Sequence, residues 1–556
     1  MRLSALLLAP FTLGCTMTTT SSTLVPTTQL AIVNARVWTG DVTRPWADAV
    51  AVTGDRISAV GSSAEIRKLA SPMTRIIDAN GAMLVPGFID SHVHFMDGGF
   101  GLTSVHLRDA KTREEFVSRI KEHASRLPPG AWMLEGNWDH QNWGGELPRK
   151  EWIDSVTPNT PVFIQRLDGH MSLANSLALR AAGVTAATKD VEGGTIVRDE
   201  RGEPTGVLKD NATGLVDRVV PDAPPSEEDK ALDAAMRFVA EQGVTSVVNM
   251  GTWANLEVFT RAHREGRMHT RIYAVVPLAT WARLRDAVAA GGRGDAWLHI
   301  GGLKGFMDGS LGSHTARMIA PFNDTPNDIG LWVTPPDSIY AWTKAADAVG
   351  LQVIIHAIGD QANRTLLDIY ERVEHENGAR PGPDRRFRIE HAQHLAPPEI
   401  PRFGRLGVIA SMQPYHAIDD GRWAERFIGA ERAKGTYAFR SLLDNGARLA
   451  FGSDWFVAPP TPLEGIYAAV TRRTLDGAHP EGWVPEQKIT VEEALRAYTS
   501  GAAYAEYMEV DKGTIARGKL ADLTLIERDL TRIPPETIRD AKILKTIVGG
   551  RIVFEK

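Results

Sequence analysis

The stretch of sequence that decides the fold is Pro86-Gly87-Phe88-Ile89-Asp90-Ser91-His92-Val93-His94. Its apolar start is typical of a buried strand, and we expect one strand over Leu84–His94. On a strand, residues i and i+2 point to the same side, so His92 and His94 face one way while Val93 faces the other. Two imidazoles that converge at the end of one strand form half of a metal site. His-x-His alone is a weak signal, and the rest of the chain decides its meaning.

Seven further apolar runs follow, and helical patterns such as 227–242, 337–349 and 363–376 separate most of them. This alternation predicts βα units around a parallel sheet, and eight strands imply a closed (β/α)8 barrel of the α/β class. The interval from Phe95 to about residue 225 is too long for one loop, so we expect an inserted subdomain or lid there. The seven runs are Thr245–Met250, Arg271–Val276, Leu303–Asp308, Gln352–His356, Arg386–His391, Gly407–Gln413 and Arg448–Asp454.

Short β-like runs fill both ends of the chain. Ala49-Val50-Ala51-Val52 is one example near the N-terminus, and Gly513-Thr514-Ile515 is one near the C-terminus. Gly54-Asp55 and Gly549-Gly550 are typical hairpin turns between such runs. We therefore expect residues 29–83 and 505–556 to form one small β-sandwich, with the barrel over 84–504 and its insertion at about 95–225.

Three more of the expected barrel strands end in residues that bind metals. These are His356, His391 and Asp454. The catalytic groups of a barrel gather at the C-terminal ends of its strands. Any one of these residues could instead cap the next helix or bond to a loop. Four independent strands that end in metal-ligand types favour a metal centre.

Several longer phrases share the order of a known family. The chain resembles the amidohydrolase superfamily, and more narrowly amidohydrolase family 3 of the YtcJ-like type, which includes N-substituted formamide deformylase. The match runs across nearly the whole chain beyond its N-terminal segment. The phrases are Gly136-Asn137-Trp138-Asp139, Asp168-Gly169-His170, Lys304–Ser313, His356-Ala357-Ile358-Gly359-Asp360, Ile389-Glu390-His391-Ala392-Gln393 and Gly452-Ser453-Asp454.

The resemblance implies a centre of two divalent ions, zinc by expectation. It also implies that Lys304 is carboxylated on its amine and bridges the two ions. A buried lysine beside cations has a lowered pKa, and its neutral amine can capture carbon dioxide. The alternative is an unmodified lysine that neutralises Asp308 or contacts substrate. The implied ligands are His92, His94, Lys304, His356, His391 and Asp454.

The expected reaction is hydrolysis of the C–N bond of an apolar N-acyl or N-substituted amide by a metal-activated water. Asp454 is the expected catalytic residue, because a carboxylate there can take a proton from the water and deliver it to the leaving nitrogen. The alternatives are hydrolysis of an ester, lactone or phosphotriester, or an exported binding protein that has lost catalysis. Retention of every ligand type argues against the last.

Candidate contacts to a small-molecule amide substrate come from the strand ends and from the aromatic-rich insertion. The alternative for Trp138 is an aromatic core that stabilises the lid. His314 stands where the family commonly has arginine, and Asn249 stands where it often has aspartate. The candidate contacts are Trp138, His170, Asp308, His314, Gln413, Tyr415 and Trp455, and His416, which with Gln413 and Tyr415 ends the seventh expected strand, is a further one.

Composition and the N-terminus indicate a soluble exported enzyme. The 556 residues are 43% hydrophobic with a net charge of −6, which gives no basic footprint for nucleic acid. Arg2, a short apolar run and Gly14-Cys15 resemble the signal and lipobox of a bacterial lipoprotein, followed by a Thr/Ser-rich tether to residue 28. The expectation is a periplasmic or membrane-anchored protein with a lipid anchor at Cys15. An ordinary signal peptide is the alternative, and a homo-oligomer is left open.

Overall fold

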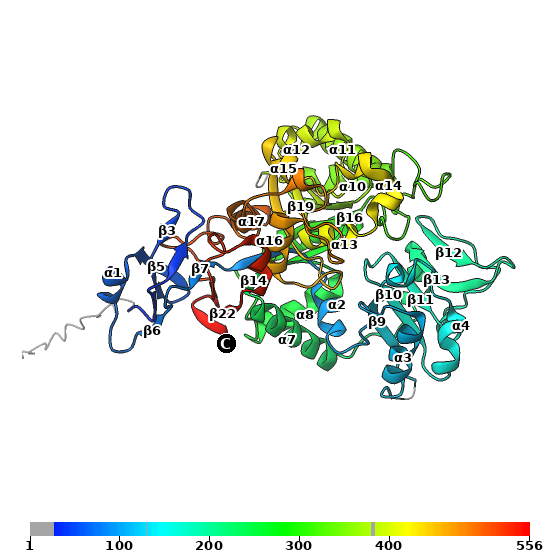
Figure 1. The fold of residues 1–556 in the computed structure, drawn as a ribbon, viewed down its shortest axis with the longest axis horizontal. Coiled ribbons are helices and arrows are strands. Elements are labelled where there is room, and N and C mark those ends of the chain that lie inside the picture. Colours follow the sequence, from blue (N-terminus) through cyan, green and yellow to red (C-terminus); the bar gives the residue numbers. More distant parts are fainter. Residues whose placement is uncertain (1–26, 129, 380–383) are drawn as a thin grey trace, which may run out of the picture.

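The computed structural model describes residues 27–128, 130–379 and 384–556. Its centre is an eight-stranded parallel sheet in which each strand pairs with the next along the chain (Figure 1). The first and last strands meet through a parallel bridge between Val93 and Trp455, which nearly closes the sheet into a barrel. The expected (β/α)8 fold is therefore confirmed. The strands are β8 (Phe88–Val93), β14 (Val244–Met250), β15 (Arg271–Pro277), β16 (Leu298–Phe306), β17 (Gln352–Ala357), β18 (Arg388–His391), β19 (Ile409–Met412) and β20 (Arg448–Phe451).

Helices surround the barrel because each crossover between parallel strands must cover the sheet. The three helical patterns expected from sequence correspond to α7, α10 and α11. Inside the barrel, side chains such as Val248, Tyr273 and Ile354 pack together, so the interior is a core. The helices are α7 (Pro225–Glu241), α8 (Trp253–Arg264), α9 (Trp281–Gly291), α10 (Pro336–Ala348), α11 (Asp360–Asn377), α12 (Ile400–Leu406), α13 (Pro414–Asp420), α14 (Ala424–Ala433), α15 (Phe439–Asp444), α16 (Pro462–Thr471), α17 (Val491–Ala497) and α18 (Ser500–Ala505).

The expected single strand Leu84–His94 is in fact two strands that belong to different sheets. β7 (Met83–Pro86) lies in a terminal sheet, and β8 begins the barrel directly after Gly87. A Cβ atom on Gly87 would lie 2.3 Å from the Thr245 hydroxyl oxygen, so only glycine fits where the chain passes between the sheets. This passage links the terminal sheets directly to the strand that carries His92.

Both chain ends build the terminal sheets, which pack face to face through residues such as Ile32, Val52 and Leu523. One sheet has the order β5-β4-β1-β6 and the other has the order β23-β22-β21-β7-β2-β3. The expected strand at Gly513–Ile515 is wrong, because these residues form a bend and an irregular segment. The strands are β1 (Leu30–Val33), β2 (Arg36–Trp38), β3 (Trp46–Ala47), β4 (Ala49–Thr53), β5 (Arg56–Gly61), β6 (Arg75–Asp78), β21 (Leu523–Ile526), β22 (Ile543–Val548) and β23 (Arg551–Glu555), with α1 (Ser63–Arg67) beside them.

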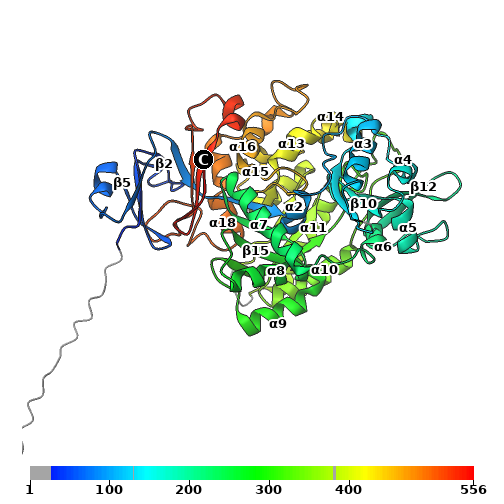
Figure 2. The ribbon, with the colours of Figure 1, turned by 90° about the horizontal axis from the view of Figure 1, so that it is seen from below.

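The long interval after β8 folds into a subdomain with its own five-stranded sheet, β12-β13-β11-β10-β9. Hydrophobic side chains cover both faces of this sheet. Figures 1 and 2 show it on the side of the barrel opposite the terminal sheets. Its elements are β9 (Met133–Trp138), β10 (Val162–Arg166), β11 (Met171–Ala174), β12 (Gly194–Arg198) and β13 (Pro204–Asp210), with α3 (Arg113–Ala124), α4 (Lys150–Ile153), α5 (Ser176–Ala182) and α6 (Gly214–Asp217). The interval begins with α2 (Phe95–Gly101), which packs against the barrel helix α7.

The described residues contain no helix that is both long and apolar enough to span a bilayer. The expected signal segment and the expected lipid anchor at Cys15 lie outside the described residues.

Candidate metal centre

The expected metal ligands gather at the C-terminal ends of the barrel strands, on the side that faces the insertion. His94 follows β8 directly, and Asp454 lies three residues beyond the end of β20. The remaining four belong to strands: His92 to β8, Lys304 to β16, His356 to β17 and His391 to β18. Strand alternation and the closure of the barrel together bring residues from five strands to one place.

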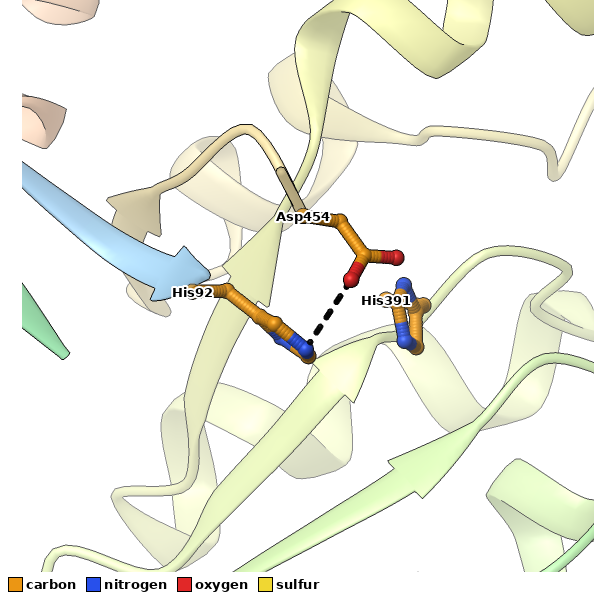
Figure 3. Close-up of side chains that lie close together, drawn as sticks. All are labelled: His92, His391 and Asp454. Atoms are coloured by element: carbon orange, nitrogen blue, oxygen red, sulfur yellow. Dashed lines mark ion pairs between the residues drawn. The ribbon is translucent and has the colours of Figure 1, made fainter. Parts of the chain in front are cut away.

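Distances show how closely these side chains converge. One donor atom each from His92, His391 and Asp454 lies within 4.8 Å of the other two (Figure 3). Asp454 Oδ1 is 3.3 Å from His92 Nε2 and 3.4 Å from His94 Nε2. Lys304 Nζ is 3.2 Å from His92 Nε2. The rings of His356 and His391 have centroids 4.5 Å apart, so all six residues belong to one cluster.

Neighbouring acceptors fix which nitrogen of each imidazole is free. His92 Nδ1 lies 2.7 Å from Glu390 Oε2, and His391 Nδ1 lies 2.8 Å from Gln413 Oε1. Both partner oxygens accept hydrogen bonds, so each Nδ1 carries the hydrogen and each Nε2 offers its lone pair. This arrangement, in which a second residue orients a histidine, is typical of metal ligands.

His356 is held in the opposite tautomer. Its Nε2 lies 3.0 Å from the Gly309 carbonyl oxygen, which can only accept, so Nδ1 has the lone pair. Burial lowers the pKa of His92, His356 and His391 well below the usual value for histidine, and neighbouring cationic groups lower it further. The three imidazoles are therefore neutral at physiological pH, which is the form that binds metals.

Lys304 has an unusual environment for a lysine. Its side chain is buried, and burial lowers the pKa of the amine to about 8, although the carboxylates of Glu390 and Asp454 act in the opposite direction. A larger fraction of this amine is neutral at physiological pH than for an exposed lysine. Neutral amine is the form that reacts with carbon dioxide.

The residues present fit a divalent metal. Asp454 is only 6% exposed, and within the described chain its Oδ1 has no hydrogen-bond partner. A buried carboxylate oxygen without a partner is costly unless a cation or water satisfies it. Neutral imidazoles and a carboxylate are the donors that zinc and similar ions take. His391 and Asp454 also have left-handed backbone conformations, with φ of 70° and 61°, which is typical of strain at functional sites.

Two cavities meet at this cluster, and His170, His356, His391 and Asp454 line both. The first has an apolar side formed by Phe306, Phe456 and Val457, next to His94, Asp97, Gln165 and Lys304. The second is bounded by charged and polar side chains, among them Asp139, Arg166, Asp168, His416, Asp419 and Asp420, with Trp423 and Leu311. Asp168 and Val457 also line both cavities, so each cavity combines charged and apolar side chains.

Two of the expected substrate contacts are wrong. Trp138 is fully buried in the hydrophobic core of the insertion, and its indole N–H donates to the Ile164 carbonyl at 2.9 Å. It forms the aromatic core of the lid, the alternative left open from sequence. Asp308 is also fully buried, and its carboxylate accepts backbone N–H groups of Arg317, Ile358 and Gly359 at 2.8–3.0 Å. It holds loops in place beneath His356.

Of the other expected substrate contacts, only some lie where a substrate could reach them. His170 lines both cavities, as a substrate contact would. Gln413 is buried and acts on His391, and Trp455 packs against Phe95 and Phe238 at the far side of the β20 loop. His314 bonds to Asp324 between the rings of Phe322 and Phe427, and the guanidinium of Arg108 lies over the ring of Tyr415. Closeness to a family motif in the sequence therefore does not distinguish side chains that line the cavities from side chains that support the residues lining them.

Four further acidic residues at the site differ in whether a family phrase contains them. Glu390 directly precedes His391 in the family phrase, so strand alternation places the two side chains on opposite sides of β18. In the structure the Glu390 side chain contacts His92. Asp139 and Asp168 also lie in family phrases, and they meet through Arg166. Asp420 had no motif, and only the fold brings it to the cavity.

Comparison with known proteins identifies the family. The sequence matches the amidohydrolase family over residues 75–554. Protein LONG AFTER FAR-RED 3 of Arabidopsis thaliana is 42% identical over 540 residues, which cover 94% of this chain and 91% of that protein. N-substituted formamide deformylase of Arthrobacter pascens is 30% identical over 547 residues, which cover 95% and 98%. An uncharacterized metal-dependent hydrolase from Pyrococcus horikoshii OT3 has a solved structure that matches with a TM-score of 0.75 and 27% identity, covering 91% of this chain and 99% of that one.

These matches extend over nearly the whole chain and agree with the barrel and the metal-ligand cluster, so the resemblance noted from sequence is confirmed. The chain belongs to the amidohydrolase family of metal-dependent hydrolases.

Proposed function

We propose that this chain hydrolyses the C–N bond of an apolar N-acyl or N-substituted amide, with two zinc ions held at the barrel strand ends. The observation that carries the proposal is the position of Asp454. Its carboxylate lies 3.3–3.4 Å from the imidazoles of His92 and His94, and in the described structure its Oδ1 lacks a hydrogen-bond partner. A carboxylate held among metal ligands at a cavity floor can exchange protons with water and with a leaving group.

The residues that would hold two ions reach the cluster from different strands. His92 and His94 come from one strand, and His356 and His391 come from the neighbouring pair, β17 and β18. Lys304 reaches the cluster from β16, with its Nζ beside His92 Nε2. Carboxylation of this amine would give an anionic oxygen ligand between the two pairs. We include this modification in the proposal, because an ammonium beside two cations would be repelled.

Bound divalent ions supply a water of lowered pKa and an electrophilic partner for the carbonyl oxygen. Asp454 orients that water and accepts its proton while the water oxygen forms a bond to the carbonyl carbon. The same carboxyl then donates the proton to the nitrogen as the C–N bond breaks. His170 lies at the same floor, with its ring centroid 4.9 Å from that of His356, and it is placed to contact the substrate carbonyl side.

Two observations support an amide with an apolar group. Phe306, Phe456 and Val457 form one wall of the cavity at the cluster. The relative from Arthrobacter pascens bears the name N-substituted formamide deformylase, which describes cleavage of such an amide. Ester or lactone hydrolysis would use the same groups, and a substrate panel distinguishes them.

The test uses metal-loaded protein with N-benzylformamide and with the matching ester, benzyl formate. The proposal expects release of benzylamine and formate, and an Asp454→Asn variant that keeps its metal but loses about 10²–10⁴ in turnover. Glu431→Gln, an exposed carboxylate change on α14, serves as the control. Turnover of the ester alone would replace amide hydrolysis with ester hydrolysis. Full activity of Asp454→Asn would refute the role given to that residue.

A further inference from the structure

The charged wall of the second cavity is built largely from helix α13 and the insertion. His416 and Asp420 stand four residues apart on α13, so they lie on one face of the helix, and both line the cavity together with Asp454. The seventh barrel strand leads directly into this helix. The helix therefore presents two polar side chains to any molecule that reaches the metal centre.

The carboxylates of this wall are not equally paired. Arg166 forms ion pairs with Asp139 at 2.9 Å and with Asp168 at 2.6 Å. Asp419 is paired with Arg108 at 2.9 Å and with Arg422.

Asp420 differs from its neighbours, because within the described residues it makes no ion pair. Its Oδ2 accepts hydrogen bonds from the Tyr437 hydroxyl at 2.6 Å and from Gln393 Nε2 at 2.9 Å. The three arginines thus form ion pairs with three of the four aspartates, whereas Asp420 feels the charges of Arg166 and Arg422 only from beyond ion-pair distance. Its second oxygen, Oδ1, has no hydrogen bond in the described chain and belongs to a residue that lines the cavity.

His416 gives an independent indication that this wall receives a ligand. Its Nε2 is buried, and among the described residues it has no hydrogen-bond partner. The ring lies nearly parallel to that of His391, with centroids 6.3 Å apart. A buried polar atom of this kind costs stability unless a ligand or water bonds to it.

We infer that the α13 wall is a subsite for a cationic amino group on the substrate, bound by the free carboxylate oxygen of Asp420 with His416 beside it. The inference rests on the proposed function, because it concerns the far end of the molecule whose amide is cleaved. The apolar part of that substrate lies against Phe306 and Phe456, and its ammonium lies against α13. The substrate class is therefore an amide of an amphipathic amine, and a wholly apolar amide fills only one side of the site.

The inference has a direct specificity test. N-benzylformamide and its para-aminomethyl derivative differ only in an aminomethyl group, which places an ammonium at the end away from the scissile bond. Wild-type protein is expected to favour the charged compound by about tenfold or more in kcat/KM, the size of one charge-assisted hydrogen bond. Asp420→Asn keeps an oxygen for Tyr437 and Gln393, and it should abolish this preference. Asp286→Asn, which removes an exposed carboxylate on α9, should retain it.

Binding without turnover separates this inference from the proposed function. Calorimetry would compare benzylamine with benzyl alcohol, at a pH of about 8, on wild type and on Asp420→Asn. Tighter binding of benzylamine to wild type, lost in Asp420→Asn, would support the subsite even if neither formamide is hydrolysed. Equal affinity of both probes for wild type, or a benzylamine preference that survives in folded Asp420→Asn, would overturn it.

Discussion

Replacing Glu390 with glutamine removes the charge that orients His92 while keeping the shape of the side chain. Glu390 is fully buried and uses both oxygens: Oε2 lies 2.7 Å from His92 Nδ1, and Oε1 accepts from Arg388 Nε at 2.9 Å. Glutamine has one accepting oxygen, so its amide N–H₂ must face either the Nδ1 hydrogen of His92 or the guanidinium. Either choice sets two donors against each other.

The expected losses of metal affinity and of unfolding free energy follow from these two contacts. Loss of a residue that orients a histidine ligand lowers metal affinity about 10–100-fold, or about 1.4–2.7 kcal/mol. Arg388 keeps its bonds to the Ser91 carbonyl and the Ser411 hydroxyl, but its charge becomes uncompensated in the barrel interior. Breaking a buried ion pair in this way costs about 3–5 kcal/mol of unfolding free energy. The variant should therefore lose both metal affinity and stability.

The assay is a zinc titration against a competing chelator, together with denaturant unfolding of the metal-free protein. Glu509→Gln is the matched control, because Glu509 also pairs with an arginine, Arg386, at 2.6 Å, but lies with one-third of its side chain exposed near the opposite end of the barrel. The control should keep wild-type zinc affinity. A folded Glu390→Gln variant whose zinc affinity equals that of wild type would refute the reasoning that Glu390 sets the tautomer of His92.

Three further predictions concern the supports of the site. Gln413→Leu removes the acceptor of the His391 Nδ1 hydrogen, so chelator competition should show zinc affinity about 10–100-fold weaker, and an unchanged affinity would contradict this. Burial raises the pKa of Asp420 to about 7. Between about pH 4 and 7 the folded protein therefore binds a proton at this group that the unfolded chain does not bind. The stability that this proton contributes is lost as the pH rises through that window. Asp420→Asn should therefore gain stability relative to wild type between pH 5 and 8 in denaturant unfolding, and a constant difference would exclude the raised pKa. Trp138→Ala should lose about 3–5 kcal/mol of unfolding free energy if the insertion unfolds with the barrel, and a loss below about 1 kcal/mol would contradict its place in the core.

Strand periodicity predicted the barrel and the convergence of four strand ends that carry metal-ligand types, whereas Lys304 was expected only from the family resemblance. Alternation places His92 and His94 on one side, and the closure of parallel strands brings His356 and His391 to the same rim. The division of Leu84–His94 into two strands could not be predicted. It depends on the close approach of Thr245 to Gly87, a contact between segments far apart in the chain.

The substrate side of the site was predicted less well for a related reason. Trp138 and Asp308 stand next to family motifs, yet packing turns one into the core of the insertion and backbone N–H groups surround the other. Asp420 carries no motif, and its importance arises from the pairing of three arginines with its neighbours. Such pairing depends on contacts between the insertion and the barrel, which no local pattern encodes.

The most direct test of the central claim is the metal content of purified wild-type protein and of Lys304→Ala, by elemental analysis after loosely bound metal is removed. The account predicts about two equivalents of zinc or a similar ion in the wild type, as in two-metal hydrolases, and fewer in the variant. Wild-type protein that holds no metal and takes none up on reconstitution would contradict it.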